Sequence, residues 1–125
     1  MGQASETRPY ALVVEDEEMQ RELLSTLLEE CEFEVLSCDR AETALDMLED
    51  AGPRLAMLFT DIELSGEMTG TELAHLVHRR FPKATVIVTS GGQTPTRLPT
   101  EAKFIPKPWR PLDVLREAER SLAAA

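Results

Sequence analysis

Residues that could carry out chemistry stand directly after short apolar segments of the sequence. Three are carboxylic acids, two carry hydroxyl groups and one is a lysine; they are Glu15, Asp16, Asp61, Thr89, Ser90 and Lys107. Carboxylates at close range repel one another, so three of them are stable together only when a cation lies among them. Because every candidate ligand is an oxygen atom, Mg²⁺ is the ion that these residue types suit best.

The remaining residues of this set suit a phosphoryl group. Mg²⁺ in proteins commonly completes its coordination with phosphate oxygens. Lys107 would offer a compact positive charge, and Thr89 a hydroxyl donor, to the other phosphoryl oxygens. Asp61 would then be the nucleophile that forms an acyl phosphate. The residue types therefore predict magnesium-dependent phosphoryl transfer to an aspartate.

Five short apolar segments predict the strands that would bring these side chains together. They are residues 10–14, 33–37, 55–60, 84–89 and 103–105. Amphipathic helices are predicted between the first four strands and after the last one. Strands that are apolar throughout and alternate with helices indicate an α/β fold with a doubly wound parallel sheet, in which the carboxyl ends of all strands share one edge.

The apolar spacing also predicts which helical residues are buried, and where the helix pattern fails. The first helix is expected to bury Met19, Leu23, Leu24, Leu27, Leu28 and Cys31, and the last helix Leu112, Leu115, Ala118 and Leu122. Residues 91–100 contain two glycines and two prolines. A regular helix is therefore not expected where the alternation would place the fourth one.

Composition limits the function classes. A chain of 125 residues suits one domain, expected at residues 10–125 after a flexible polar lead-in at residues 1–9. The net charge of −10 argues against a nucleic-acid partner. No apolar stretch is long enough for membrane insertion and no signal core is visible, which indicates a cytoplasmic protein. Cys31 and Cys38 are expected to be reduced thiols.

Four motifs resemble, in order and spacing, the signatures of bacterial response-regulator receiver domains of two-component systems. They are residues 13–17 (VVEDE), 59–61 (FTD), 88–90 (VTS) and 104–108 (FIPKP), within a similarity that covers about residues 10–122. The resemblance implies a flavodoxin-like five-stranded sheet of order 2-1-3-4-5. Residues 91–100 resemble the subset of single-domain receivers whose fourth helix is degenerate.

The resemblance also implies a role for each residue of the motifs. Asp61 matches the phosphoacceptor, which takes its phosphoryl group from a histidine kinase or a histidine phosphotransfer protein. Asp16 matches the direct Mg²⁺ ligand and Glu15 the acid that acts through bound water, while the backbone carbonyl of Glu63 would be a further ligand. Thr89 and Lys107 match the residues that contact the phosphoryl group, and Thr89 and Phe104 match the conformational switch. The chain would be a signalling domain with Mg²⁺-dependent self-phosphorylation and autodephosphorylation, and not an enzyme.

Departures from the family pattern leave alternatives open. Leu64-Ser65 replace the usual Met-Pro pair, and Gly70 follows Asp61 by nine residues instead of eight, which predicts a more mobile loop. One alternative is a receiver-like docking module that works without phosphorylation. A haloacid-dehalogenase-like phosphatase is a weaker alternative, because that family needs Asp where Glu63 stands. His75 and His78 lie off the apolar stripe of their helix and are expected to be solvated.

Overall fold

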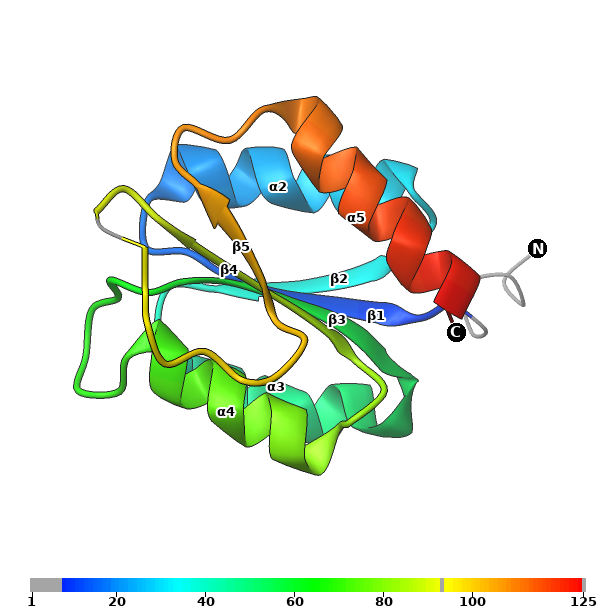
Figure 1. Cartoon of the computed structure of the whole chain (residues 1–125). Coiled ribbons are helices and arrows are strands. Elements are labelled where there is room, and N and C mark those ends of the chain that lie inside the picture. Colours follow the sequence, from blue (N-terminus) through cyan, green and yellow to red (C-terminus); the bar gives the residue numbers. More distant parts are fainter. Residues whose placement is uncertain (1–7, 93, 125) are drawn as a thin grey trace.

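The protein consists of a central sheet between two layers of helices (Figure 1). The computed structural model describes residues 8–92 and 94–124. Five strands form one sheet of order β2-β1-β3-β4-β5, and every neighbouring pair is parallel. The strands are β1 (Tyr10–Val14), β2 (Glu34–Cys38), β3 (Leu55–Asp61), β4 (Thr85–Ser90) and β5 (Lys103–Pro106). The predicted doubly wound α/β fold and its strand order are confirmed. No predicted strand end differs from the observed one by more than one residue.

Helices cover both faces of this sheet. The described helices are α2 (Glu18–Glu30), α3 (Ala41–Ala51), α4 (Gly70–Arg80) and α5 (Pro111–Ala124), with a short 3₁₀ turn η1 (Gly52–Arg54) before β3. Helices α2 and α5 lie together on one face, and α3 and α4 lie on the other (Figure 1). No helix within the described residues is both long enough and apolar enough to span a membrane.

The three central strands, β1, β3 and β4, are apolar on both faces because each face of the sheet has its own core. In β1, Ala11 and Val13 belong to the cluster under α2 and α5, whereas Leu12 and Val14 belong to the cluster over α3 and α4. A strand covered by helices on both sides cannot alternate apolar and polar residues. The continuous apolar runs of the sequence are therefore explained by the two helix layers.

The amino end of α4 is fixed directly onto the end of β3. Thr69 and Glu72 form a capping box, in which each side chain accepts a hydrogen bond from the other residue's backbone N–H at 3.1 Å and 2.9 Å. A Cβ atom on Gly70 would lie only 1.8 Å from the carbonyl oxygen of Asp61. Only glycine permits this close approach, so the helix start and the strand end are held as one unit.

The connection between β4 and β5 contains no helix among its described residues, 91–92 and 94–102. This confirms the prediction drawn from its glycines and prolines; Gln93 lies outside the described residues. Leu98 and Ala102 pack against the core cluster that α3 and α4 cover. His75 of α4 was expected to be solvated, but its Nε2 atom lies 2.6 Å from the carbonyl oxygen of Arg97. The irregular connection therefore packs over α4 and the adjoining sheet face.

Two predicted buried stripes are wrong at their borders. Met19 and Leu23 of α2 are 79% and 46% exposed, and Leu112 of α5 is 50% exposed. The residues that α2 and α5 bury completely or nearly so are Leu24, Leu28, Val114, Ala118 and Ser121. Apolar spacing marks a stripe that is more than 100° wide, and packing against a twisted sheet decides which border of it stays exposed. Most of the lead-in predicted at residues 1–9 falls on residues 1–7, outside the described residues.

Candidate functional site

Three carboxylates meet at the carboxyl edge of the sheet. Val14 pairs with Thr60, so the residues that follow them from β1 and β3 are brought side by side. One oxygen of each of Glu15, Asp16 and Asp61 lies within 4.8 Å of the others. Glu15 and Asp61 are almost completely buried, and Asp16 is exposed. The cluster is therefore anchored in the interior and open to solvent on one side.

Lys107 reaches this cluster from the far side of β4. Its Nζ atom lies 2.5 Å from Oδ2 of Asp61 and 3.1 Å from Oε1 of Glu15. The backbone N–H of Lys107 donates to the carbonyl oxygen of Ser90 at 2.9 Å, which continues the pairing of β4 and β5 past the end of the strand. The predicted convergence of Glu15, Asp61 and Lys107 is thus present in the structure.

The pKa directions of these groups follow from burial and charge. Burial raises the pKa of Glu15, the hydrogen bonds from Glu17 N–H and Lys107 lower it, the charge of Asp61 raises it, and the net direction is upward. Burial lowers the pKa of Lys107, but its hydrogen bonds and charge contacts with Asp61 and Glu15 outweigh burial and raise the pKa overall. The lysine therefore stays charged, and the acids compete for it.

The Asp61 carboxylate and the neighbouring Thr89 hydroxyl can still bind further polar groups. Oδ1 of Asp61 accepts a hydrogen bond from the backbone N–H of Glu63 at 3.1 Å. Thr89 lies opposite Asp61 in the register of β3 and β4. Its Oγ1 atom is buried and has no hydrogen-bond partner in the structure. A buried hydroxyl without a partner is costly, which favours an oxygen-rich group binding beside Asp61.

Phe104 lies one strand away from this hydroxyl. It pairs with Val88, the residue before Thr89, in the register of β4 and β5. Its side chain is half-buried and lies outside both core clusters. The aromatic ring that does reach the core here is Trp109, which packs edge-on against Phe59 with ring centres 6.2 Å apart.

Glu63 and Ser90 form a contact that the sequence analysis missed. The Ser90 hydroxyl donates to the Glu63 carboxylate, with oxygens 2.9 Å and 3.2 Å away, and accepts from Gly92 N–H at 3.0 Å. The sequence predicts Ser90 at the sheet edge without a partner, and it gives Glu63 a role only through its backbone carbonyl. The pairing joins the loop after β3 to the end of β4 beside the site.

A second missed residue is Glu42, in the first turn of α3. Its Oε2 atom accepts hydrogen bonds from the backbone N–H groups of Glu67 and Met68, at 3.0 Å and 2.9 Å. The bond from Met68 is the largest cause of a lowered pKa at Glu42. The sequence indicated this contact only through the position of Glu42. The residue follows the second strand closely and therefore lies near the carboxyl edge of the sheet.

The donor set fits a hydrated divalent cation. Three carboxylates and one ammonium group leave a net charge of −2 when all are ionised. All ligand atoms are oxygens, and one acid is exposed, so water can remain in the coordination shell. These are the conditions that Mg²⁺ requires.

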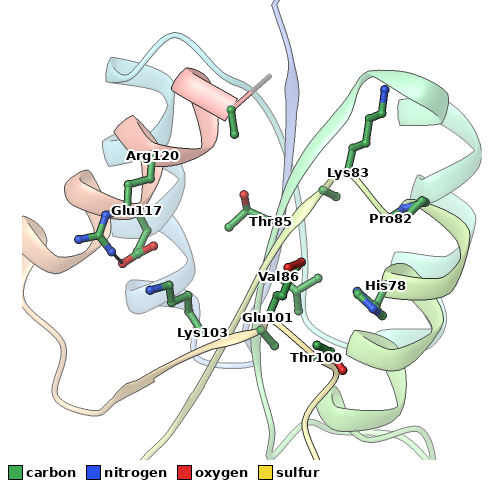
Figure 2. Close-up of a pocket in the computed structure, with 13 residues that line it drawn as sticks. His78, Pro82, Lys83, Thr85, Val86, Thr100, Glu101, Lys103, Glu117 and Arg120 are labelled. Atoms are coloured by element: carbon green, nitrogen blue, oxygen red, sulfur yellow. Dashed lines mark hydrogen bonds and ion pairs between the residues drawn. The ribbon is translucent and has the colours of Figure 1, made fainter.

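A separate pocket lies at the opposite end of the sheet. It has a volume of about 310 Å³ and lies at the amino ends of β4 and β5, beside the carboxyl ends of α4 and α5 (Figure 2). Lys83, Lys103 and Glu101 on its rim are exposed. Arg120 is already paired with Glu117 at 3.0 Å. This pocket contains none of the predicted site residues.

Comparison with protein families identifies the family to which this fold belongs. The model of the response regulator receiver domain matches residues 11–118. The chain belongs to this family. A receiver domain is a signalling domain of two-component systems, in which histidine kinases or phosphotransfer proteins supply the phosphoryl group. The family sets aside the interpretation of the chain as a phosphatase of the haloacid-dehalogenase type.

Individual relatives agree with this assignment. The two-component response regulator ORR11 of Oryza sativa subsp. indica is 32% identical over 121 residues, which cover 91% of this receiver and 81% of the rice protein. The receiver domain of the hybrid histidine kinase CckA is 26% identical, with a TM-score of 0.77 over 90% of this chain and 98% of that one. The response regulator receiver protein from Sinorhizobium medicae WSM419 shares the fold, with a TM-score of 0.84 and 18% identity over 94% and 96% of the two chains.

Proposed function

We propose that this chain is a phosphorylatable receiver whose phosphoacceptor is Asp61. The proposal rests on two groups beside the Asp61 carboxylate. The Nζ atom of Lys107 lies 2.5 Å from Oδ2 of Asp61, and the Thr89 hydroxyl on the neighbouring strand is buried without a hydrogen-bond partner. A phosphoryl group on Asp61 would give both residues an anionic oxygen to bind.

In the proposed reaction an oxygen of Asp61 attacks the phosphorus of a phosphohistidine on a histidine kinase or phosphotransfer protein. The P–N bond breaks as the O–P bond forms, and the leaving imidazole takes up a proton. Lys107 and Thr89 bind the phosphoryl oxygens and hold them in place for in-line transfer. Water attacking the same phosphorus later would return Asp61 to a free carboxylate.

Mg²⁺ is the proposed cofactor. Glu15, Asp16, Asp61 and the backbone carbonyl of Glu63 would hold it, with Asp16 on the exposed side of the cluster. When bound, the ion supplies positive charge that offsets the charge developing on the phosphoryl oxygens. The positive charge of Lys107 lies between two buried acids, Glu15 and Asp61.

The proposed output is a change at the β4–β5 side of the domain. Thr89 would turn its hydroxyl toward the phosphoryl group, and Phe104, now half-buried, would fill the space behind it. The irregular residues 91–92 and 94–102 lie between these two strands and would be part of the surface that a protein partner binds. We further propose that residues 10–125 form the receiver, that it acts in the cytoplasm, and that its partners are proteins and not nucleic acid.

One observation favours a second candidate function, a docking module that works without phosphorylation. Glu63 places a carboxylate at the rim of the site, where Ser90 already binds it. A fixed anion beside Asp61 opposes the approach of a phosphoryl group.

The deciding experiment is the intact mass of the protein after incubation with phosphoramidate, a small phosphoryl donor, and MgCl₂. We expect one added phosphoryl group, which is absent in Asp61→Asn and absent when EDTA replaces the metal. Asp39→Asn, at a half-buried acid that follows β2, serves as the matched control and should be labelled like the wild type. A wild-type protein that gains no mass, even at times short enough to precede hydrolysis, would favour the docking module.

A further inference from the structure

The loop after β3, residues 62–69, is bound to the structure on both sides; we call it the metal loop. At its start, Glu63 N–H donates to Asp61 at 3.1 Å, and its carboxylate accepts from Ser90 at 2.9 Å. These contacts fix the first two residues of the loop against β3 and β4.

Glu42 of α3 holds the other half of the metal loop. Its carboxylate accepts two backbone hydrogen bonds, from Glu67 at 3.0 Å and from Met68 at 2.9 Å. Gly66 has φ +97°, and a Cβ atom there would lie 2.6 Å from Oε1 of Glu42. The loop therefore curves around this carboxylate at a glycine, the residue that such a φ angle favours. Arg40, just before α3, also forms an isolated bridge with Ser65.

We propose that Glu42 is a positioning residue for divalent-ion binding. This inference rests on the proposed function, in which the carbonyl of Glu63 is a metal ligand. A loop of eight residues that must be ordered on binding would weaken the ion's affinity by the entropy of that ordering. Glu42 lowers this cost for the second half of the loop, because it holds residues 66–68 in place before the ion arrives.

The role of Glu42 depends on its position, and not only on its charge. It is exposed and contacts the metal loop at residues 67 and 68, four and five positions beyond Glu63. Asp46 is an exposed acid one turn further along the same helix. Replacing either acid by alanine removes one negative charge from α3, so the difference between the two variants isolates the contact.

The test is a MgCl₂ titration of ¹⁵N-labelled protein, followed through the amide signals of residues 15–17 and 61–63. We expect the dissociation constant for Mg²⁺ to rise about tenfold in Glu42→Ala, the low end for residues that orient a metal ligand from outside. Asp46→Ala should change it by less than about twofold. Hydrogen exchange at the amides of Glu67 and Met68 should become faster in Glu42→Ala alone. Glu42→Gln keeps an acceptor oxygen and should give intermediate values.

If the wild type binds Mg²⁺, two results would overturn the positioning role. One is an equal change of Mg²⁺ affinity in Glu42→Ala and Asp46→Ala, which would show a charge effect alone. The other is faster exchange at residues 67 and 68 with unchanged Mg²⁺ affinity, which would leave Glu42 a purely structural residue.

Failure of the proposed function is a different observation, the absence of phosphoryl transfer to Asp61 in wild-type protein that binds Mg²⁺ normally. A wild type that shows no Mg²⁺ binding would overturn the positioning role and the metal site together.

Discussion

Lys107 and Asp61 are joined across an intervening strand: the lysine follows β5, the aspartate ends β3, and Nζ lies 2.5 Å from Oδ2 over the end of β4. The same ammonium group lies 3.1 Å from Glu15 after β1. One cation therefore links the ends of three strands and offsets part of the charge of two nearly buried acids. Lys107 and Asp61, which are 46 positions apart in the sequence, therefore interact as one electrostatic unit.

The stability of this unit should depend on Lys107 and on a divalent ion together. In Lys107→Met with EDTA at pH 7, two buried carboxylates lose their common partner, and the free energy of unfolding should fall by about 3 kcal/mol. MgCl₂ should restore part of the loss, since the ion replaces the missing positive charge. Urea unfolding with and without Mg²⁺ measures both effects. The control is Lys103→Met, an exposed lysine on β5; an equal loss in both variants would refute the prediction.

Gly70 should tolerate no side chain. A Cβ atom there would meet the backbone carbonyl oxygen of Asp61 at 1.8 Å, and neither the strand end nor the capped helix start can move away easily. Gly70→Ala should therefore lower the free energy of unfolding by about 3 kcal/mol or more. Gly91→Ala is the matched control, because a Cβ atom at Gly91 meets nothing within 4 Å. Thermal unfolding of both variants checks this, and similar melting temperatures would contradict it.

The contact between Glu42 and the metal loop should fail in acid. The pKa of Glu42 lies below its usual value of 4.5, chiefly because Met68 N–H donates to the ionised form. A group whose pKa is lowered by folding stabilises the protein above its unfolded pKa, and this contribution is lost as the pH falls through the folded value. The stability difference between wild type and Glu42→Gln should thus be constant above about pH 5 and shrink below pH 4.5. Urea unfolding between pH 3 and pH 6 tests this; a difference that grows on acidification has the wrong sign.

The two cysteines should react slowly in the folded protein. Burial raises the pKa of Cys38 to about 11, and the residue is only 7% exposed. Burial also raises the pKa of Cys31, which is more accessible. Because the thiolate is the reactive form, an aromatic disulfide reagent at pH 8 should modify Cys31 first and Cys38 only as fast as the protein unfolds. Cys31→Ser leaves Cys38 alone for this measurement, and rapid labelling of that variant would contradict the burial.

Much of the fold could be predicted because its signals are local. The apolar runs of β1, β3 and β4 follow from neighbouring residues, and the prolines and glycines of residues 91–100 already exclude a regular helix. The same holds for the site: Glu15, Asp16, Asp61, Thr89 and Lys107 each lie at or just past the carboxyl end of a strand, and the carboxyl ends of parallel strands must meet at one edge. The alternation of elements was therefore sufficient to predict which residues come together.

Tertiary structure alone decided two features: which apolar residues at the edge of each helix stay exposed, and which partners the loop residues bind. Met19, Leu23 and Leu112 fit the apolar periodicity of their helices, yet they are exposed, because the angle at which each helix packs on the sheet is not encoded in local spacing. Glu63 binds Ser90 across 27 positions, and Glu42 binds Glu67 across 25. These partners are distant in the sequence and become neighbours only in the folded chain. An acidic residue in a sequence does not indicate which backbone N–H groups or side chains it will contact. The sequence thus determined the sheet and the chemistry at its edge, whereas packing determined how the loops around that chemistry are held.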